Sequence, residues 1–282
     1  MTPEFPWRNI TQKEVSDEYK RLCKILNCEK YSASCFNSIA EDQPLPFSTK
    51  GFPCSNKWFQ YERMNTPGIG RPSTVEYWKK KHQNITAFSD REKRDLFSTC
   101  NFFNHAPSQF PIVTAGIIYK FLGATKILDP YAGWGDRCLA SIALNIPYIG
   151  IDKNEALREP YNAMIREFSS ECTQMIFSKA EDVHISSLDF DFVLTSPPWW
   201  VKGKMIERYE GIEISFDQFM TQSLIPVFRR LIVKAKYVCL YISESMYLEL
   251  SKIFGKCNFV ISFKTTSSKV STLYCWSKQD RA

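Results

Sequence analysis

Apolar runs alternate with helical patterns along the second half of the chain. The runs that fit buried strands lie at residues 126–129, 147–152, 175–177, 191–194 and 237–242. Residues 111–121, with a proline at the start, and residues 216–233, with a kink expected at Pro226, have the apolar spacing of helices. Residues 259–263 and 273–276 fit a closing hairpin. This alternation predicts an α/β fold, a mostly parallel sheet with helices on both faces.

The first hundred residues follow a different pattern. Three helix starts fit the capping box, in which Glu comes three residues after Ser or Thr. The pairs are Thr11 with Glu14, Ser73 with Glu76 and Ser89 with Glu92. An apolar stripe at helical spacing follows the first start. Its members are Val15, Tyr19, Leu22 and Leu26. Residues 44–72 are rich in Pro, Gly, Ser and Asn, which predicts irregular chain or a linker.

Length and composition fit an enzyme with an appended region. The 282 residues are enough for one large core plus a smaller part, which we place at 101–282 and 1–100. No apolar run approaches the roughly 18 residues of a membrane span, and no signal-peptide pattern is visible. Cys138, Cys239 and Cys275 lie in apolar patterns. We therefore expect reduced core thiols in an intracellular protein of the cytoplasm or nucleus.

The formal net charge is +6, and most of the positive excess lies in residues 51–100. Basic groups alternate there with Tyr77 and Trp78, which suits a nucleic-acid backbone and its bases. A solvated helix face fits the same pattern equally well. The candidate nucleic-acid-binding residues, including two lysines after residue 200, are Lys79, Lys80, Lys81, Arg91, Arg94, Lys202 and Lys204.

A rigid aromatic turn follows the apolar run 191–194. Residues 195–200 read TSPPWW. Two adjacent prolines fix φ and supply no N–H groups, so the carbonyl groups around them stay available as acceptors. Such oxygens can hold an exocyclic amino group while an aromatic ring stacks on the base that carries it. Methylation of a nucleobase amine requires this arrangement, whereas the plain alternative is a loop that ends a strand.

A glycine-rich turn lies upstream. Residues 126–137 read KILDPYAGWGDR, a strand that ends in an acid, two glycines and the start of a helix. Glycine permits positive φ and the close approach of a ligand. Neither G-x-G-x-x-G nor a P-loop is present. Asp152 ends the next apolar run, where an acid can contact ribose hydroxyls, and Glu181 and Asp182 follow the run after that.

In this order, the motifs resemble those of the S-adenosylmethionine-dependent amino-methyltransferases of DNA, which modify adenine N6 or cytosine N4. Residues 129–135 are similar to the cofactor motif Asp-Pro-Phe-x-Gly-x-Gly, with Tyr131 in place of phenylalanine. Residues 196–199 are similar to the catalytic motif (Asp/Asn/Ser)-Pro-Pro-(Tyr/Phe/Trp). The resemblance covers residues 101–276. It implies a Rossmann-like class I methyltransferase fold with a mostly parallel seven-stranded sheet and S-adenosyl-L-methionine as cofactor.

The resemblance also implies residue roles. The catalytic residues are Ser196, Pro197, Pro198 and Trp199. The Ser196 side chain and the Pro197 carbonyl accept hydrogen bonds from the target amino group, and Trp199 stacks on the unstacked base. The residues expected at the methionine end of the cofactor are Asp129, Gly133 and Gly135, with Phe110 and Pro111 beside them, and Tyr131 is also expected to contact the cofactor. Asp152 contacts the ribose, and Asp182, or alternatively Glu181, contacts the adenine amino group.

Other candidate sites are less well supported. Pro53-Cys54 is similar to the nucleophile motif of cytosine-C5 methyltransferases, but it precedes the glycine turn and no Glu-Asn-Val matches it. The cysteines at positions 23, 28, 35 and 54 contain no C-x-x-C pair, so no metal site is predicted. The histidines are expected to be surface or capping residues; they are His82, His105 and His184.

Three functions remain open. The first is methyl transfer to the exocyclic amino group of a DNA base, with cytosine N4 slightly favoured over adenine N6 because serine opens the catalytic motif. The second is an enzyme of the same fold that acts on an RNA base or a protein glutamine. The third is a non-catalytic subunit that binds nucleic acid within a methyltransferase complex. No large recognition domain follows the catalytic turn, so recognition falls to residues 1–100 or a partner, or specificity is loose.

Overall fold

The computed structural model describes residues 5, 7–28, 44–67, 72–81, 89, 107–201, 204–205, 214–265 and 269–278. Within them, a seven-stranded sheet has the order β3-β2-β1-β4-β7-β9-β8. The strands are β1 (Ile127–Asp129), β2 (Tyr148–Asp152), β3 (Thr173–Phe177), β4 (Phe192–Thr195), β7 (Tyr237–Leu240), β8 (Phe259–Lys264) and β9 (Val270–Ser277). Strands β3, β2, β1, β4 and β7 pair in parallel, and β9 runs antiparallel to both of its neighbours. This is the Rossmann-like class I methyltransferase topology, which confirms the predicted fold.

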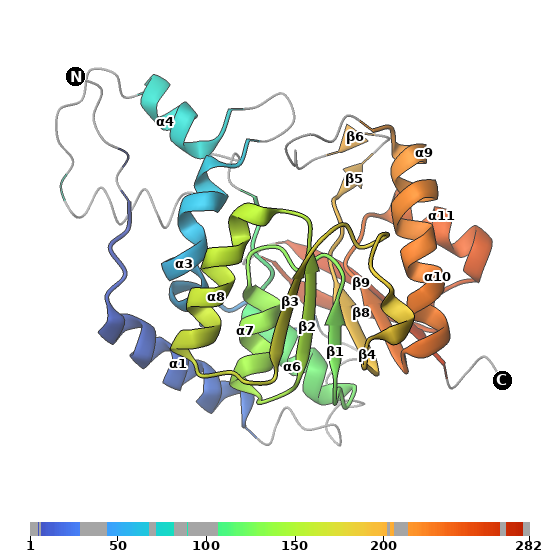
Figure 1. Cartoon of the computed structure of the whole chain (residues 1–282), viewed down its shortest axis with the longest axis horizontal. Coiled ribbons are helices and arrows are strands. Elements are labelled where there is room, and N and C mark those ends of the chain that lie inside the picture. The colour runs from blue at the N-terminus through green and yellow to red at the C-terminus, as the bar shows by residue number, and fades with distance from the viewer. Residues whose placement is uncertain are drawn as a thin grey trace.

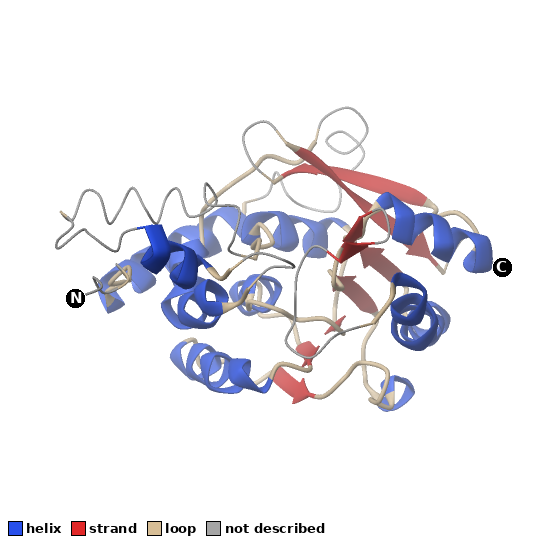
Figure 2. Ribbon diagram, turned by 90° about the horizontal axis from the view of Figure 1, so that it is seen from above, coloured by secondary structure: helices blue, strands red, loops and turns tan. Residues whose placement is uncertain are grey.

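Helices cover both faces of the sheet (Figures 1 and 2). On one face lie α1 (Gln12–Leu26), α3 (Phe52–Asn65), α6 (Ile112–Phe121), α7 (Asp136–Ala143) and α8 (Arg158–Glu167). On the other lie α9 (Phe216–Phe219), the π-helical turn η5 (Met220–Leu224), α10 (Ile225–Lys234) and α11 (Glu244–Phe254). The remaining elements are α4 (Thr74–Lys81), the 3-10 turns η3 (Glu155–Leu157) and η4 (Ile185–Ser187), and the hairpin β5 (Trp200–Val201) and β6 (Lys204–Met205).

The central strands are apolar on both sides because each face meets a helical layer. In β4, Phe192 and Leu194 belong to the core under α6 and α7, whereas Val193 belongs to the core under α10 and α11. Every residue of α6 except Lys120 is buried, which explains why this helix is apolar all round. The Lys120 ammonium donates to the Leu26 carbonyl at the end of α1.

The prediction of irregular chain or a linker at residues 44–72 is wrong, because α3 occupies the centre of this segment. Gly51 precedes the helix at φ +91°, and proline lies in the first helical turn. The helix has no strong apolar stripe, yet it buries Cys54, Phe59 and Met64. Tertiary packing therefore stabilises a helix that local composition disfavours.

Residues from the N-terminal hundred share the core of the sheet. Val15, Leu22 and Leu26 of α1 and Phe59 of α3 pack in the same cluster as α6 and α7. The predicted boundary at residue 100 therefore does not mark a break in the core. A small separate cluster packs Val75 and Trp78 of α4 against Phe5 and against Met64 of α3.

Most of the predicted local features are present. Thr11 caps α1, and Ser73 and Glu76 exchange the two bonds of a capping box. Glu92 of the third pair lies outside the described residues. The helix expected at 216–233 is interrupted by η5, just before Pro226. Helix α11 was not anticipated. No helix of the described ranges combines the length and apolar character needed to cross a membrane.

Candidate active site

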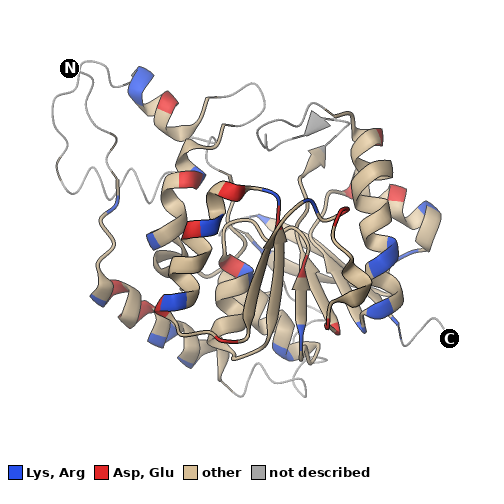
Figure 3. Cartoon of the chain, in the orientation of Figure 1, with Lys and Arg blue, Asp and Glu red and all other residues tan. Residues whose placement is uncertain are grey.

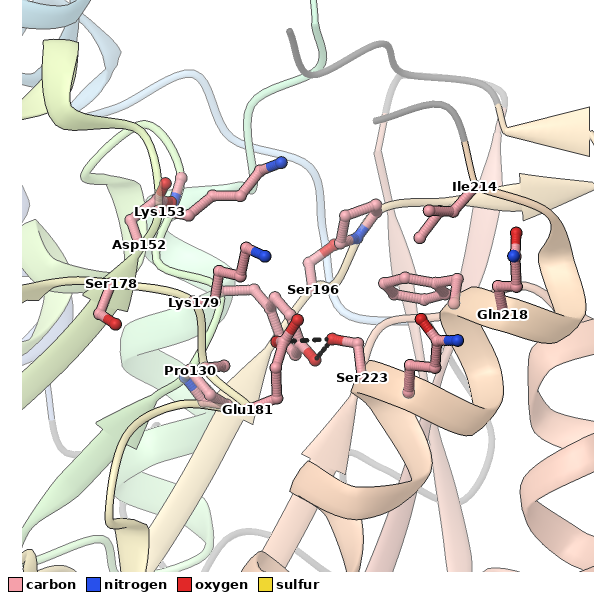
Figure 4. Close-up of a pocket in the computed structure, with 16 residues that line it drawn as sticks. Pro130, Asp152, Lys153, Ser178, Lys179, Glu181, Ser196, Ile214, Gln218 and Ser223 are labelled. Carbon is pink, nitrogen blue, oxygen red and sulfur yellow. Dashed lines mark hydrogen bonds between the residues drawn. The ribbon is translucent and has the colours of Figure 1, made fainter. Parts of the chain in front are cut away.

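The carboxyl ends of the parallel strands open onto a cavity of about 200 Å³, which we term the main cavity (Figure 4). The loops after β1, β2, β3 and β4 line it together with α9 and η5. Its residues are Pro130, Tyr131, Gly133, Asp152, Lys153, Ser178, Lys179, Ala180, Glu181, Ser196, Pro198, Ile214, Gln218, Phe219, Gln222 and Ser223. Ligands of open α/β sheets bind at this edge, where strand order reverses.

A smaller cavity of about 40 Å³, the second cavity, adjoins the main one. Tyr131, Gly133 and Ser196 line both cavities. The other residues of the second cavity are Ser108, Gln109, Phe110, Ala132, Trp134, Asp136, Arg137, Trp199 and Tyr241. The glycine turn and the catalytic turn predicted from the sequence therefore meet at the wall between two cavities.

The two glycines of the turn after β1 are each required for a different structural reason. Gly133, at φ +62°, donates its N–H to Asp152 Oδ2 at 2.7 Å. Gly135, at φ +76°, lies so close to α3 that a Cβ would meet Phe59 Cε2 at 2.5 Å. The Tyr161 hydroxyl of α8 donates to the Gly133 carbonyl at 3.0 Å and accepts from the Gly135 N–H at 3.1 Å. Contacts with Asp152, Phe59 and Tyr161 therefore hold the loop in place.

Asp129, which was expected beside the methionine end of a cofactor, is fully buried, lines neither cavity and accepts hydrogen bonds from several neighbouring side chains. Its Oδ2 accepts from Arg137 Nε at 2.7 Å and from the Tyr148 hydroxyl at 2.8 Å. Its Oδ1 accepts from the Thr195 hydroxyl at 2.6 Å. Thr195 Oγ1 in turn accepts from the Tyr131 N–H at 3.2 Å. The carboxylate therefore joins the glycine turn to the residue before Ser196.

Asp152 stands at the end of β2 with its carboxylate at the cavity wall (Figure 4). It accepts from the Gly133 N–H and, through Oδ1, from the Asn154 N–H at 2.9 Å. Burial raises the pKa of Asp152 to about 6, although the two N–H donors act in the opposite direction. Each oxygen retains a lone pair for a hydroxyl ligand.

Lys153 and Lys179 extend from the loops after β2 and β3 toward the side of the cavity where Ser196 lies (Figure 4). Burial lowers the pKa of Lys153, whereas the Asp152 carboxylate raises it. The two ammonium groups and the carboxylates of Asp152 and Glu181 give the cavity a balanced charge.

The loop after β3 presents Glu181, and not Asp182, to the main cavity. Asp182, the residue expected to contact the cofactor, is exposed and lines neither cavity, whereas the alternative, Glu181, lines the main cavity. The Ser223 hydroxyl donates to Glu181 Oε2 at 2.9 Å, so the Tyr131 hydroxyl, 3.2 Å from Ser223, is the donor in that second bond (Figure 4). Burial raises the pKa of Tyr131, which keeps the phenol protonated for this bond.

The Ser-Pro-Pro-Trp turn after β4, predicted to be catalytic, leaves several of its oxygens without hydrogen bonds. The carbonyl of Thr195, the last residue of β4, accepts a hydrogen bond from the Tyr241 N–H at 2.9 Å. Among the described residues, no donor bonds to the carbonyls of Ser196, Pro197 or Pro198, and the Ser196 hydroxyl makes no hydrogen bond. Of these residues, Ser196 lines both cavities and Pro198 the main one, whereas Pro197 is buried and lines neither.

Trp199 lines the second cavity, and its side chain is held in place by Tyr241. Its Nε1 donates to the Tyr241 carbonyl at 3.1 Å, and its ring lies 4.7 Å from the Tyr241 ring at 60°. Trp200 is buried and stacks on Phe219. Of the two tryptophans, only Trp199 is placed to meet a ligand.

The remaining predicted residues divide into three groups. Phe110 lines the second cavity, whereas Pro111 precedes α6, and Pro111 and Gly135 line neither cavity. Lys79 and Lys80 are exposed on α4, which carries charges of both signs (Figure 3). The other basic candidates lie outside the described part of the chain: they are Arg91, Arg94 and Lys202, and the side chains of Lys81 and Lys204.

The alternative sites have structural explanations. Cys54 is fully buried, its thiol donates to the Val15 carbonyl, and burial raises its pKa to about 12. A thiol in that state is a poor nucleophile. Cys138, Cys239 and Cys275 are buried free thiols, as expected. Within the described ranges, no group of His, Cys, Asp and Glu side chains is placed to hold a metal ion.

Sequence reasoning missed the residues that come from outside the motifs. Ser223 and Gln222 reach the main cavity from η5, and Asp136 lines the second cavity directly after the glycine turn. Asp136 was visible in the sequence, because an acid at a helix start beside a glycine turn is a local signal. Ser223 had no such signal, since its place depends on how α10 packs.

No family model and no curated protein matches the chain. Among solved structures it is similar to TrmN from Thermus thermophilus, with 15% identity over 60% of this chain and 49% of that one, at a TM-score of 0.46. The Pyrococcus abyssi tRNA (uracil-54, C5)-methyltransferase, bound to S-adenosyl-L-homocysteine, has 15% identity over 60% and 40% at 0.43. The hMettl16 catalytic domain, in complex with the MAT2A 3′UTR hairpin 6, has 11% identity over 61% and 72% at 0.45. The chain thus spans less than half of the first two proteins.

Proposed function

We propose that this protein transfers a methyl group from S-adenosyl-L-methionine to an exocyclic amino nitrogen of a nucleic-acid base. One observation carries the proposal. Ser196 lines both cavities with a hydroxyl that makes no hydrogen bond, and the carbonyls of Ser196, Pro197 and Pro198 accept none from the described residues, although Pro197 is buried and lines neither cavity. An amino group that enters there can donate both of its hydrogens, which favours a pyramidal nitrogen with a localised lone pair.

The residues of the main cavity fit the adenosine part of the donor. The Asp152 carboxylate suits the ribose hydroxyls. Glu181 suits an adenine amino group, and Phe219, Ile214 and Pro198 offer apolar surface to the ring. The donor, when bound, supplies an electrophilic methyl group on a sulfonium. The protein's own contribution is to hold the acceptor nitrogen in line through preorganised oxygens and close positioning.

The choice of substrate follows from the motif. A DNA base, with cytosine N4 ahead of adenine N6, is the first candidate because of the Ser-Pro-Pro-Trp sequence. An RNA base is the second, since two of the similar solved structures are a tRNA methyltransferase and a complex with an RNA hairpin. A glutamine amide has the same chemistry but no ring for Trp199, and a non-catalytic subunit would not need unpaired acceptors at the turn.

The test is a transfer assay with radiolabelled donor. Single- and double-stranded DNA and RNA of random sequence are incubated with the protein, digested, and analysed by mass for the modified nucleoside. N4-methylcytosine or N6-methyladenine supports the proposal, and the polymer that carries it decides between the candidates. Ser196→Ala lowers turnover and spares donor affinity, whereas Asp152→Ala lowers donor affinity. A ring-carbon methylation, or no transfer to any polymer by a donor-binding protein, refutes the proposal.

A further inference from the structure

Asp136 is a buried carboxylate for which the proposed reaction has so far given no role. It opens α7 directly after the glycine turn and is only 3% exposed. Its Oδ1 accepts two hydrogen bonds, from Ser55 Oγ at 2.8 Å and from Gln109 Nε2 at 3.0 Å. Its Oδ2 accepts none from the described residues.

The unpartnered oxygen faces the second cavity. Some polar side-chain atoms of the described residues are fully enclosed and lack a hydrogen-bond partner, and Asp136 Oδ2 is not among them. Since Oδ2 also lacks a partner, part of its surface must be open to space outside the protein atoms. Asp136 lines the second cavity and not the main one. A carboxylate buried with one oxygen aimed into a cavity needs a donor or a cation from a ligand.

No described side chain forms an ion pair with this carboxylate, although the charges of Arg63 and Arg137 act to lower its pKa. No ion pair of the described residues includes Asp136. The nearby Arg137 is engaged by Asp129 and by the carbonyls of Tyr131 and Ala132, and Arg63 donates to the Pro107 carbonyl and to Asn56. Burial raises the pKa of Asp136 to about 6, so at neutral pH it holds a desolvated charge.

The wall of the second cavity also includes Arg137, whose charge is neutralised by Asp129 and whose guanidinium lies 5.5 Å from the centre of the Phe110 ring. The aromatic side chains of Trp134, Trp199 and Tyr241 line the same cavity, and aromatic faces attract ammonium groups. A carboxylate beside aromatic rings is the combination that recognises a small organic cation.

The two cavities are positioned to share one ligand. Gly133 belongs to both, and a Cβ there would meet only the Tyr131 carbonyl oxygen, at 4.0 Å. The space beside Gly133 is therefore not filled by protein, and a ligand in the main cavity can continue past it. We propose that the α-ammonium group of the donor's amino-acid end binds Asp136 in the second cavity, while the adenosine part occupies the main cavity.

This inference rests on the proposed function and gives α3 a part in the donor site. Ser55 of α3 orients the Asp136 carboxylate, and Phe59 of the same helix packs against Gly135. The N-terminal hundred residues would then contribute to binding of the donor as well as to any contact with nucleic acid.

The test compares two ligands by calorimetric titration of the full chain. S-adenosylhomocysteine carries the ammonium as its only cation, and its deaminated analogue keeps the carboxylate but lacks the ammonium. Asp136→Asn should weaken S-adenosylhomocysteine about 10- to 100-fold, the range for a lost charge-assisted bond, and leave the analogue within about twofold. Glu181→Gln is the matched control, because it should weaken both ligands by a similar factor.

The pH dependence of the unmodified protein provides an independent measurement if the variant does not fold. Asp152 faces the ribose of both ligands, so its titration cancels in the ratio of their affinities. The preference for S-adenosylhomocysteine should be complete above about pH 6 and fall as Asp136 is protonated below it. Equal losses for both ligands in Asp136→Asn, or a ratio constant with pH, overturn the inference. If neither ligand binds the unmodified protein, the proposed function itself fails.

Discussion

Removal of the Asp129 carboxylate should destabilise the protein through Arg137. In Asp129→Ala, the Arg137 guanidinium stays buried, with 6% of its side chain exposed, and loses its only ion-pair partner in the described structure. Leaving such a charge uncompensated costs about 3–5 kcal/mol. The hydroxyls of Tyr148 and Thr195 lose their acceptor as well, which adds about 1 kcal/mol each. The total of roughly 5–7 kcal/mol is comparable with the whole stability of many domains.

A double-mutant cycle separates this reason from simple loss of packing. Arg137→Met in the same chain removes the stranded charge, and replacing a buried ion pair with apolar groups is often nearly neutral. The double variant should therefore be more stable than Asp129→Ala alone, with a coupling energy of about 2–4 kcal/mol in urea unfolding. If Asp129→Ala does not fold, recovery of a cooperative transition in the double variant is the readout. Additive losses would refute the account of Asp129 as the partner that neutralises Arg137.

The remaining predictions concern the same loops. Gly135→Ala should lower stability by several kcal/mol, because the residue is at φ +76° and the new Cβ would lie 2.5 Å from Phe59; Phe59→Ala empties a buried site and is itself destabilising, but the loss in the double variant should be smaller than the sum of the two single losses, as thermal unfolding of all three variants measures. Asp136→Asn should stabilise the unliganded protein by up to about 3 kcal/mol at pH 7, because the pKa rises from 3.8 to about 6 on folding. Protonation favours the native state here, so this advantage should vanish as the pH falls below about 4, and a variant less stable at neutral pH would contradict it. Ser196→Ala should reduce turnover by about 10- to 1000-fold without changing donor affinity, the loss typical of one positioned polar group; single-turnover transfer and titration measure the two effects, and unchanged turnover would remove Ser196 from the mechanism.

Local signals predicted the elements that carry the motifs. Strands β1, β2 and β4 were recognisable because both of their faces are buried, which leaves continuous apolar runs. The turns after β1 and β4 were recognisable because glycine and proline restrict the backbone in ways that few other residues do. Placing these turns at one edge then followed from the parallel order of the strands.

Non-local packing explains what the sequence did not reveal. Helix α3 contains polar residues and a proline, and it forms because Phe59 and Cys54 are buried against other helices. Asp129 carries the motif's acidic position, but its burial beside Arg137 depends on residues from β2 and β4 as well as the turn. The choice between Glu181 and Asp182 depended on the path of one loop, which neighbouring acids of equal charge do not determine.

The π-helical turn at Met220–Leu224 fixes the angular position of one wall of the main cavity. The Ile225 N–H bonds to the Met220 carbonyl, five residues back, so this stretch accommodates one residue more than an α-helical turn. Deleting one residue there would restore ordinary helical spacing and rotate Ser223 by about 100° relative to α10. The relay from Tyr131 to Glu181 would then lose its middle member while the core behind α10 stayed in place. Variation in length at this turn is therefore a route by which related chains can reshape the pocket without rebuilding the sheet.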